Sequence, residues 1–191
     1  MSKQIKRSVP TRYRSDMMRS RLEARWAKVF DSLGIEYYYE PQLYKFGDIS
    51  YLPDFYLPRQ DIFFEAKGVM DKDDEQKISA LAENTKKDIV IGYPNGTFQL
   101  VDMTGHDLLF FSIKGKEPHI TEETYHLCSL PLNWYSKIET WLAKCGKCRQ
   151  WHFLNFQTSY ACRVCGHYDG DYKAGSHMGD KNLFEELGVF L

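Results

Sequence analysis

Asp54, Glu65 and Lys67 form the most informative pattern of chemically active side chains in this 191-residue chain. They lie on two apolar stretches, 51–57 and 62–67, which we predict to be strands joined by a four-residue turn. Pairing the last residue of the first strand with the first residue of the second sets Asp54 directly opposite Glu65, with Cβ atoms about 5 Å apart. Lys67 follows Glu65 by two residues and shares its face of the sheet. Two carboxylates so close repel each other, so a cation is expected between them.

This group of side chains suits a bound divalent cation. Mg²⁺ prefers oxygen ligands and keeps some of its waters, so two carboxylates, a backbone carbonyl and water complete a site. Bound Mg²⁺ or Mn²⁺ polarises a phosphoryl oxygen and acidifies an attacking water, and a nearby lysine offsets charge that builds on phosphorus. The simpler interpretation is a solvated pair of charges, because Glu-x-Lys is common on exposed strands.

The pattern Pro53-Asp54 followed by Glu65-Ala66-Lys67 resembles the signature of the PD-(D/E)XK nuclease superfamily. The resemblance implies that Asp54 and Glu65 bind the metal with help from the carbonyl of Ala66, and that Lys67 is catalytic. The small size of the chain is similar to the phage-type and junction-resolving branches of that superfamily. DNA is the expected substrate, and RNA stays open.

A helix is predicted ahead of these strands. Ser15 is a candidate N-cap, apolar residues recur at helical spacing up to Leu33, and Gly34 suits the C-terminal stop. Glu23 lies at the edge of the apolar stripe. Many members of the nuclease superfamily carry a glutamate on a first helix that faces the metal, so the resemblance extends to Glu23. The alternative is a boundary residue paired with an arginine.

The remaining periodicity predicts an α/β fold. The helix 72–85 crosses over between strands, as a βαβ unit requires. We predict an αβββαβ mixed central sheet flanked by helices, an order that also resembles the core of the nuclease superfamily. One branch of that superfamily has a tyrosine four residues after a glutamine of the crossover helix, and here Gln76 is followed by Ala80 instead. The other expected elements are a strand at 35–40, a loop or short hairpin at 43–50, and strands at 89–93, 97–103 and 108–113.

A second motif lies near the C-terminus. The pairs Cys145–Cys148 and Cys162–Cys165 are C-x-x-C knuckles separated by thirteen residues. Four thiolates at this spacing predict a tetrahedral structural zinc site in a zinc ribbon. Two unrelated pairs of buried or disulfide-bonded cysteines are the alternative. His152 and His167 are candidate substitute ligands, although four cysteines already complete the site.

Composition divides the chain into expected segments. These are a basic arm (1–14), a nuclease-like domain (15–115), a linker with a helix (116–143), the zinc ribbon (144–168) and a tail with a short docking helix (169–191). The net charge of −1 argues against a protein that coats nucleic acid. Because the arm is basic, contact with phosphates is expected from it, and the alternative is that the arm is a solvated tail. Paired cysteines, no apolar run of membrane-spanning length and no secretory signal predict a cytoplasmic protein, in the host cytoplasm if the chain is phage-encoded.

We therefore predict a metal-dependent nuclease that hydrolyses phosphodiester bonds, a DNA endonuclease with Mg²⁺ or Mn²⁺ at one site and structural Zn²⁺ at another. The alternative is a non-catalytic zinc-ribbon factor that binds nucleic acid or a polymerase on a silent nuclease-like scaffold. A homodimer or a protein partner stays open.

Overall fold

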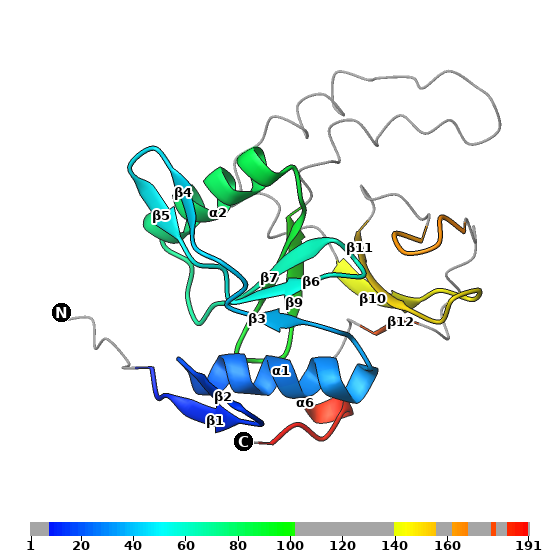
Figure 1. Cartoon of the computed structure of the whole chain (residues 1–191). Helices are drawn as coiled ribbons and strands as arrows, with labels where there is room; N and C mark the ends of the chain where they lie inside the picture. The colour runs from blue at the N-terminus through cyan, green and yellow to red at the C-terminus, as the bar shows by residue number, and fades with distance from the viewer. Residues whose placement is uncertain (1–7, 102–139, 156–161, 168–176, 179–182, 191) are drawn as a thin grey trace, which may run out of the picture.

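The chain forms a mixed α/β protein around a five-stranded sheet with the order β3-β6-β7-β8-β9. The computed structural model describes residues 8–101, 140–155, 162–167, 177–178 and 183–190 (Figure 1). The sheet strands are β3 (Tyr38–Tyr39), β6 (Phe55–Leu57), β7 (Ile62–Ala66), β8 (Ile89–Gly92) and β9 (Phe98–Val101). The predicted strand at 108–113 lies outside the described residues.

The register of the predicted hairpin is confirmed. β6 and β7 are antiparallel with Leu57 opposite Ile62, and the four residues between them form the turn. The first strand is shorter than predicted, however. Tyr51 ends a separate hairpin of β4 (Tyr44–Phe46) and β5 (Ile49–Tyr51), and regular pairing in the sheet resumes only at Phe55.

A crossover helix joins the two central strands. β7 and β8 are parallel, and α2 (Lys72–Thr85) connects them with the predicted bounds. Asp71 caps this helix through the N–H groups of Asp73 and Asp74, which explains the start after an acidic run. The turn at 95–96 then returns the chain antiparallel into β9, as its Asn-Gly sequence indicated.

The N-terminal helix begins later than predicted. Helix α1 (Arg21–Leu33) is capped by Ser20 instead of Ser15, because the Ser20 hydroxyl accepts the N–H of Glu23. Ser20-x-x-Glu23 is the capping-box spacing, a signal that Ser15 lacks. Gly34 ends the helix in the left-handed conformation, as predicted.

Residues assigned to the arm and to the first helical turns form a hairpin instead. β1 (Thr11–Tyr13) pairs with β2 (Asp16–Met18), and Arg14 in the turn has a φ of 52°. Met18, expected in the helical stripe, is fully buried from a strand. The arm thus ends before residue 11, and residues 1–7 lie outside the described part.

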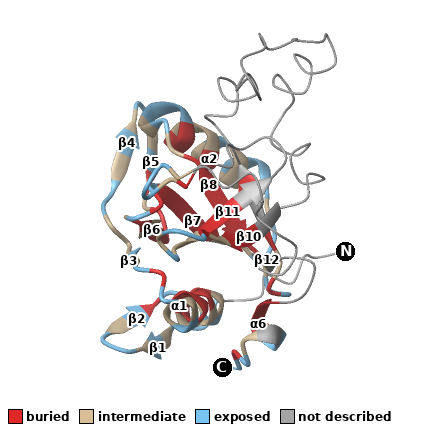
Figure 2. Cartoon of the chain, turned by 90° about the vertical axis from the view of Figure 1, so that its right-hand side faces the viewer, coloured by how far each residue is buried: buried red, intermediate tan, exposed pale blue. Residues whose placement is uncertain are grey.

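The two long helices cover opposite faces of the sheet (Figure 1). Phe64 belongs to the core under α1 with Trp26 and Phe30, whereas Phe63 belongs to the core under α2. The strand β7 is therefore buried on both faces, and Figure 2 shows buried residues concentrated along β7 and β8. Glu65 of this strand is fully buried, and Asp54 beside it is 6% exposed.

The cysteine-rich region is built on a smaller sheet. β10 (Thr140–Lys144) pairs antiparallel with β11 (Trp151–Asn155) and with β12 (His177–Met178). Residues 140–143, which were assigned to the linker with a helix, are thus part of a strand in which Leu142 and Ala143 are buried. Leu142 and Phe153 lie in the same core cluster as Trp26.

The C-terminal segment docks on α1 through α6 (Leu183–Glu186). The Phe184 ring lies 4.9 Å from Trp26, which agrees with the expected docking helix. Phe190, expected in its buried stripe, is 72% exposed because the chain turns at Gly188 and buries Val189 instead. In the described segments, no helix is long and apolar enough to cross a membrane.

Candidate functional site

Asp54 and Glu65 lie side by side where β6 begins and β7 ends. The N–H of Asp54 donates to Glu65 Oε1 at 3.2 Å. The N–H of Ala66 donates to Asp54 Oδ2 at 2.8 Å. Asp54 is 6% exposed and Glu65 is fully buried, so the pair expected from the register is present and largely removed from water.

Lys67 lies beside this pair, as its spacing predicted. Its Nζ is 3.9 Å from Glu65 Oε2 and 2.8 Å from Oδ1 of Asp74, which belongs to the first turn of α2. Burial disfavours the ammonium, but Glu65, Asp74 and Asp54 outweigh that effect and raise the pKa of Lys67. Lys67 therefore stays charged, and Asp74 holds it from a position that sequence analysis did not single out.

Arg19 is the second cation at the site, and sequence analysis missed it. One terminal nitrogen of its guanidinium lies 2.7 Å from Asp54 Oδ1, and its Nε lies 2.6 Å from Glu40 Oε1. Part of the positive charge expected beside the two carboxylates is thus supplied by Arg19, the residue before the N-cap of α1. No signal in the sequence indicated this contact, because Arg19 was assigned to the helix interior.

Glu23 completes the acidic group from α1, where it is only 5% exposed. Its Oε1 accepts the hydroxyl of Ser20 at 2.7 Å, and its Oε2 accepts the Tyr39 hydroxyl at 2.7 Å and the backbone N–H of Arg19 at 3.0 Å. Its charge also raises the pKa of Asp54. The structure therefore brings Glu23 to the site, and the hydrogen bonds to its carboxylate come from neutral donors.

The surroundings of Asp54 and Glu65 disfavour the ionised form of both carboxyl groups. Burial, followed by the charge of Glu23, raises the pKa of Asp54 to about 6, against the opposing effects of the Ala66 N–H, Lys67 and Arg19. Burial and then the charge of Asp54 raise the pKa of Glu65 well above its ordinary value. A cation bound to both carboxylates would offset the free-energy cost of ionising them in a buried site.

One oxygen of the pair is left without a hydrogen bond. Among the described residues, Glu65 Oε2 is a buried atom with no hydrogen-bond partner, and the Tyr51 hydroxyl is another. Buried carboxylate oxygens are normally satisfied, so an oxygen in this position could serve as a metal ligand. The donor set, two carboxylates beside backbone groups, fits a hard divalent cation. The Ala66 amide already contacts Asp54, and the role of its carbonyl as a ligand stays a prediction.

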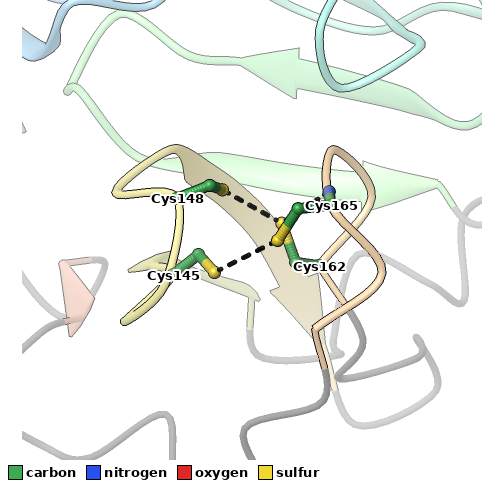
Figure 3. Close-up of side chains that lie close together, drawn as sticks. All are labelled: Cys145, Cys148, Cys162 and Cys165. Atoms are coloured by element: carbon green, nitrogen blue, oxygen red, sulfur yellow. Dashed lines mark hydrogen bonds between the residues drawn. The ribbon is translucent and has the colours of Figure 1, made fainter.

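The four paired cysteines form the other candidate site. Figure 3 shows their side chains converging from two turns, and their sulfur atoms all lie within 4.8 Å of one another. The Sγ atoms are 3.4 Å apart for Cys148 and Cys162, and 4.0 Å apart for Cys145 and Cys165. Zn–S bonds of about 2.3 Å in a tetrahedron separate sulfurs by about 3.8 Å, so the spacing suits one zinc ion. In the described part of the chain, no other group of three or more His, Cys, Asp or Glu residues has its ligand atoms close enough together to hold one metal ion.

Each knuckle is shaped by backbone hydrogen bonds. Cys145 N–H donates to the carbonyl of Gln150, and Cys162 N–H donates to that of His167, both at 2.9 Å. Burial raises the pKa of the Cys145 thiol, but the N–H groups of Cys148 and Lys147 outweigh burial and lower it to about 7. The backbone thus favours a thiolate, the form that binds metal, at Cys145, whereas burial raises the pKa of Cys148 and raises that of Cys162 to about 12.

The two histidines take different parts. His152 is buried, and its Nε2 lies 3.1 Å from Cys162 Sγ, so it contacts a candidate ligand. His167 contributes its backbone carbonyl to the second knuckle. β10 and β11 form a hairpin that flanks the first knuckle.

No family model matches this chain, and no similar curated protein or solved structure was found. The functional assignment therefore depends on the geometry of these two sites.

Proposed function

We propose that this protein is a metal-dependent nuclease that hydrolyses phosphodiester bonds, with DNA as its substrate. The supporting observation is the buried Asp54–Glu65 pair, whose Glu65 Oε2 has no hydrogen bond among the described residues and faces Lys67 at 3.9 Å. A structural ion pair has no need of a second buried carboxylate, whereas a hydrolytic metal site does.

The order of elements supports the same proposal. When the hairpins β1–β2 and β4–β5 are set aside, α1 is followed by β3, β6, β7, α2 and β8. With those hairpins set aside, this sequence of elements agrees with the αβββαβ order that the resemblance to the PD-(D/E)XK superfamily implies. In that order Asp54 directly precedes the second strand, Glu65 belongs to the third, and Glu23 belongs to the first helix.

The side chains divide the chemistry among them. Asp54 and Glu65 would hold Mg²⁺ or Mn²⁺ with the Ala66 carbonyl, and the ion when bound supplies polarisation of a phosphoryl oxygen and a more acidic water. Lys67 would donate a hydrogen bond to the attacking water and offset charge on the phosphorus. Glu23 would orient a water from the α1 side.

The cysteine site would hold structural Zn²⁺. Its role is to close the two knuckles against β10 and β11, with all four ligand positions filled by protein. Contacts to the nucleic-acid backbone would come from the basic residues 1–7 and from the β1–β2 hairpin, whose Arg12 is exposed. Such contacts position a substrate without reading its sequence.

The test is a cleavage assay on zinc-loaded protein with labelled duplex, single-stranded, flap and junction DNA, in Mg²⁺, Mn²⁺ or EDTA. Cleavage should require the divalent cation and fall at least about a hundredfold in Asp54→Asn, Glu65→Gln and Lys67→Ala, as expected when a metal ligand or an electrostatic group is lost. Asp73→Asn is the matched control, because Asp73 is an exposed carboxylate paired with Lys77 away from the acidic pair. Equal cleavage by Asp54→Asn and wild type would overturn the assignment.

A second candidate function has one observation in its favour. Arg19 already occupies Asp54 Oδ1, as in a protein whose acidic pair is a structural ion-pair network. In that case the chain would be a non-catalytic factor that binds nucleic acid or a polymerase through its ribbon. Tight binding of DNA without cleavage under every metal condition would favour this candidate.

A further inference from the structure

The guanidinium of Arg19 contacts the Asp54 carboxylate, which a divalent cation would also use. Its guanidinium lies 2.7 Å from Asp54 Oδ1, while Asp54 Oδ2 is taken by the Ala66 N–H. Both oxygens of Asp54 are therefore satisfied by the protein itself. Each oxygen keeps a further lone pair, but a metal ion that used Asp54 would lie beside the positive charge of Arg19 and compete with it, and the side chain of Arg19 is more easily moved than a backbone amide within the sheet.

The position of Arg19 allows such a movement. Its side chain is 50% exposed, whereas Asp54 and Glu65 are buried beneath it. The backbone N–H of Arg19 is held separately, by Glu23 Oε2 and by the Tyr39 hydroxyl, each at 3.0 Å. The guanidinium can therefore leave Asp54 while the backbone beneath it stays fixed.

Glu40 provides a second acceptor for the same guanidinium. Its Oε1 lies 2.6 Å from Arg19 Nε. Glu40 has a φ of 45° and precedes Pro41, a conformation that is unfavourable for a residue with a side chain and more so before proline. Its backbone N–H donates to the carbonyl of Asp54 at 2.8 Å, which ties this strained residue to the site. Strain of this kind concentrates at functional sites.

We propose that Arg19 is an internal counter-ion that competes with the divalent cation for Asp54 and, once displaced, stays on Glu40 and contacts a phosphate of the substrate. This inference rests on the proposed nuclease function. A guanidinium suits the second role because its planar fork of donors matches a phosphate group. Arg19 would then balance the charge of Asp54 before the metal binds, and the charge of a substrate phosphate afterwards.

The first test is a calorimetric titration of zinc-loaded protein with Mg²⁺. Arg19→Ala should bind Mg²⁺ about tenfold more tightly than wild type, the change expected when a competing charge-assisted hydrogen bond is removed. Arg59→Ala is the matched control, since Arg59 pairs with Glu36 at 3.1 Å and is absent from the site. Its Mg²⁺ affinity should equal that of wild type.

The second test measures the affinity for duplex DNA in a Lys67→Ala background, which is expected to be inactive. With Mg²⁺ present, adding Arg19→Ala to zinc-loaded protein should weaken DNA binding about tenfold, whereas in buffer without Mg²⁺ it should change binding little because Arg19 is tied to carboxylates. Adding Arg59→Ala should have no effect in either condition.

The outcomes separate the two proposals. If wild type and Arg19→Ala bind Mg²⁺ equally, or if Arg19→Ala weakens DNA binding to the same degree with and without Mg²⁺, the role of Arg19 is wrong and the nuclease proposal stands. If wild type binds no Mg²⁺, or Asp54→Asn binds it as well as wild type, the metal site itself is wrong and both proposals are overturned.

Discussion

Asp54 is more easily protonated in the folded protein than in the unfolded chain. Its pKa rises from 3.8 to about 6, first through burial and then through Glu23. A carboxyl group whose pKa is raised by folding contributes stability that is fully present below about pH 4 and is lost as the pH rises through 6. At neutral pH the charged acidic pair therefore lowers the free energy of unfolding.

Replacing Asp54 should reveal this cost. Without Mg²⁺, Asp54→Asn should be more stable than wild type at pH 7.5, by up to about 3 kcal/mol, and the advantage should shrink toward zero as the pH falls to 4. Urea unfolding across this pH range measures the difference, with Asp73→Asn as the control. Mg²⁺ should raise the stability of wild type at pH 7.5 and leave Asp54→Asn unchanged. A stability difference that does not vary with pH would contradict the prediction.

At the residue scale, the sequence predicted the partners that depend on strand register. Asp54, Glu65 and Lys67 come together because the side-chain period of a strand is two and the turn fixes the pairing. Arg19, Glu40 and Tyr39 could not be predicted in the same way. Their contacts depend on how separate elements meet in space, and no periodicity within one element encodes such a meeting.

At the scale of elements, Gly92 sets how closely β8 approaches α1. A Cβ placed on Gly92 would lie 2.5 Å from Trp26 Cε2 and 2.7 Å from Phe64 Cε1, both in the buried core. Neither ring has room to move, because Trp26 also contacts Phe30 and Phe184. The end of β8, which accepts the N–H of Lys67 through the Gly92 carbonyl at 2.9 Å, is therefore fixed by the lack of a side chain.

Gly92→Ala should consequently lower the free energy of unfolding by about 3 kcal/mol, the cost of overfilling a close-packed core. Gly68→Ala is the control, because a Cβ at Gly68 meets no atom within 4 Å and its φ is not in the left-handed region. Thermal unfolding of both variants measures the contrast. Equal melting temperatures for the two variants would show that the core accommodates the methyl group.

The predicted elements were most accurate where local signals are strong. The bounds of α2 follow from an acidic start, and the β8–β9 turn follows from Asn-Gly. The start of α1 was placed at Ser15 although Ser20-x-x-Glu23 carries the capping-box signal. The strand β10 was missed because an apolar run at 134–144 fits helical spacing as well, and only pairing with β11 and β12 decides between them.

At the scale of the whole molecule, the cysteine site and the acidic site share one core. Phe153 of β11 lies 5.9 Å from Phe64 and 5.1 Å from Phe98 of the central sheet. Arg163 in the second knuckle pairs with the fully buried Asp88 just before β8. The Gln60 amide in the β6–β7 turn donates to the carbonyl of Trp151 at 3.0 Å. These contacts join the ribbon to the strands that carry the acidic pair.

Zinc removal should therefore weaken the entire fold. An independent C-terminal module would unfold alone in Cys145→Ser or Cys162→Ser, but the shared core predicts one cooperative transition at a lower melting temperature. Hydrogen exchange should show protection falling in β7 together with β10. Cys128→Ser, which lies outside both cysteine pairs, should leave both unchanged. Loss of protection in β10 alone would mean that the two parts unfold independently.

The position of Phe153 also bears on how this protein can change over generations. Zinc ribbons often act as detachable modules, but here an insertion, deletion or exchange of the ribbon would uncover Phe64 and Phe98. A gene that lost the segment would encode a central sheet with part of its core open to water. We therefore expect the two parts to be inherited together, with the ribbon preserved by selection on the fold even in lineages where it contacts no ligand.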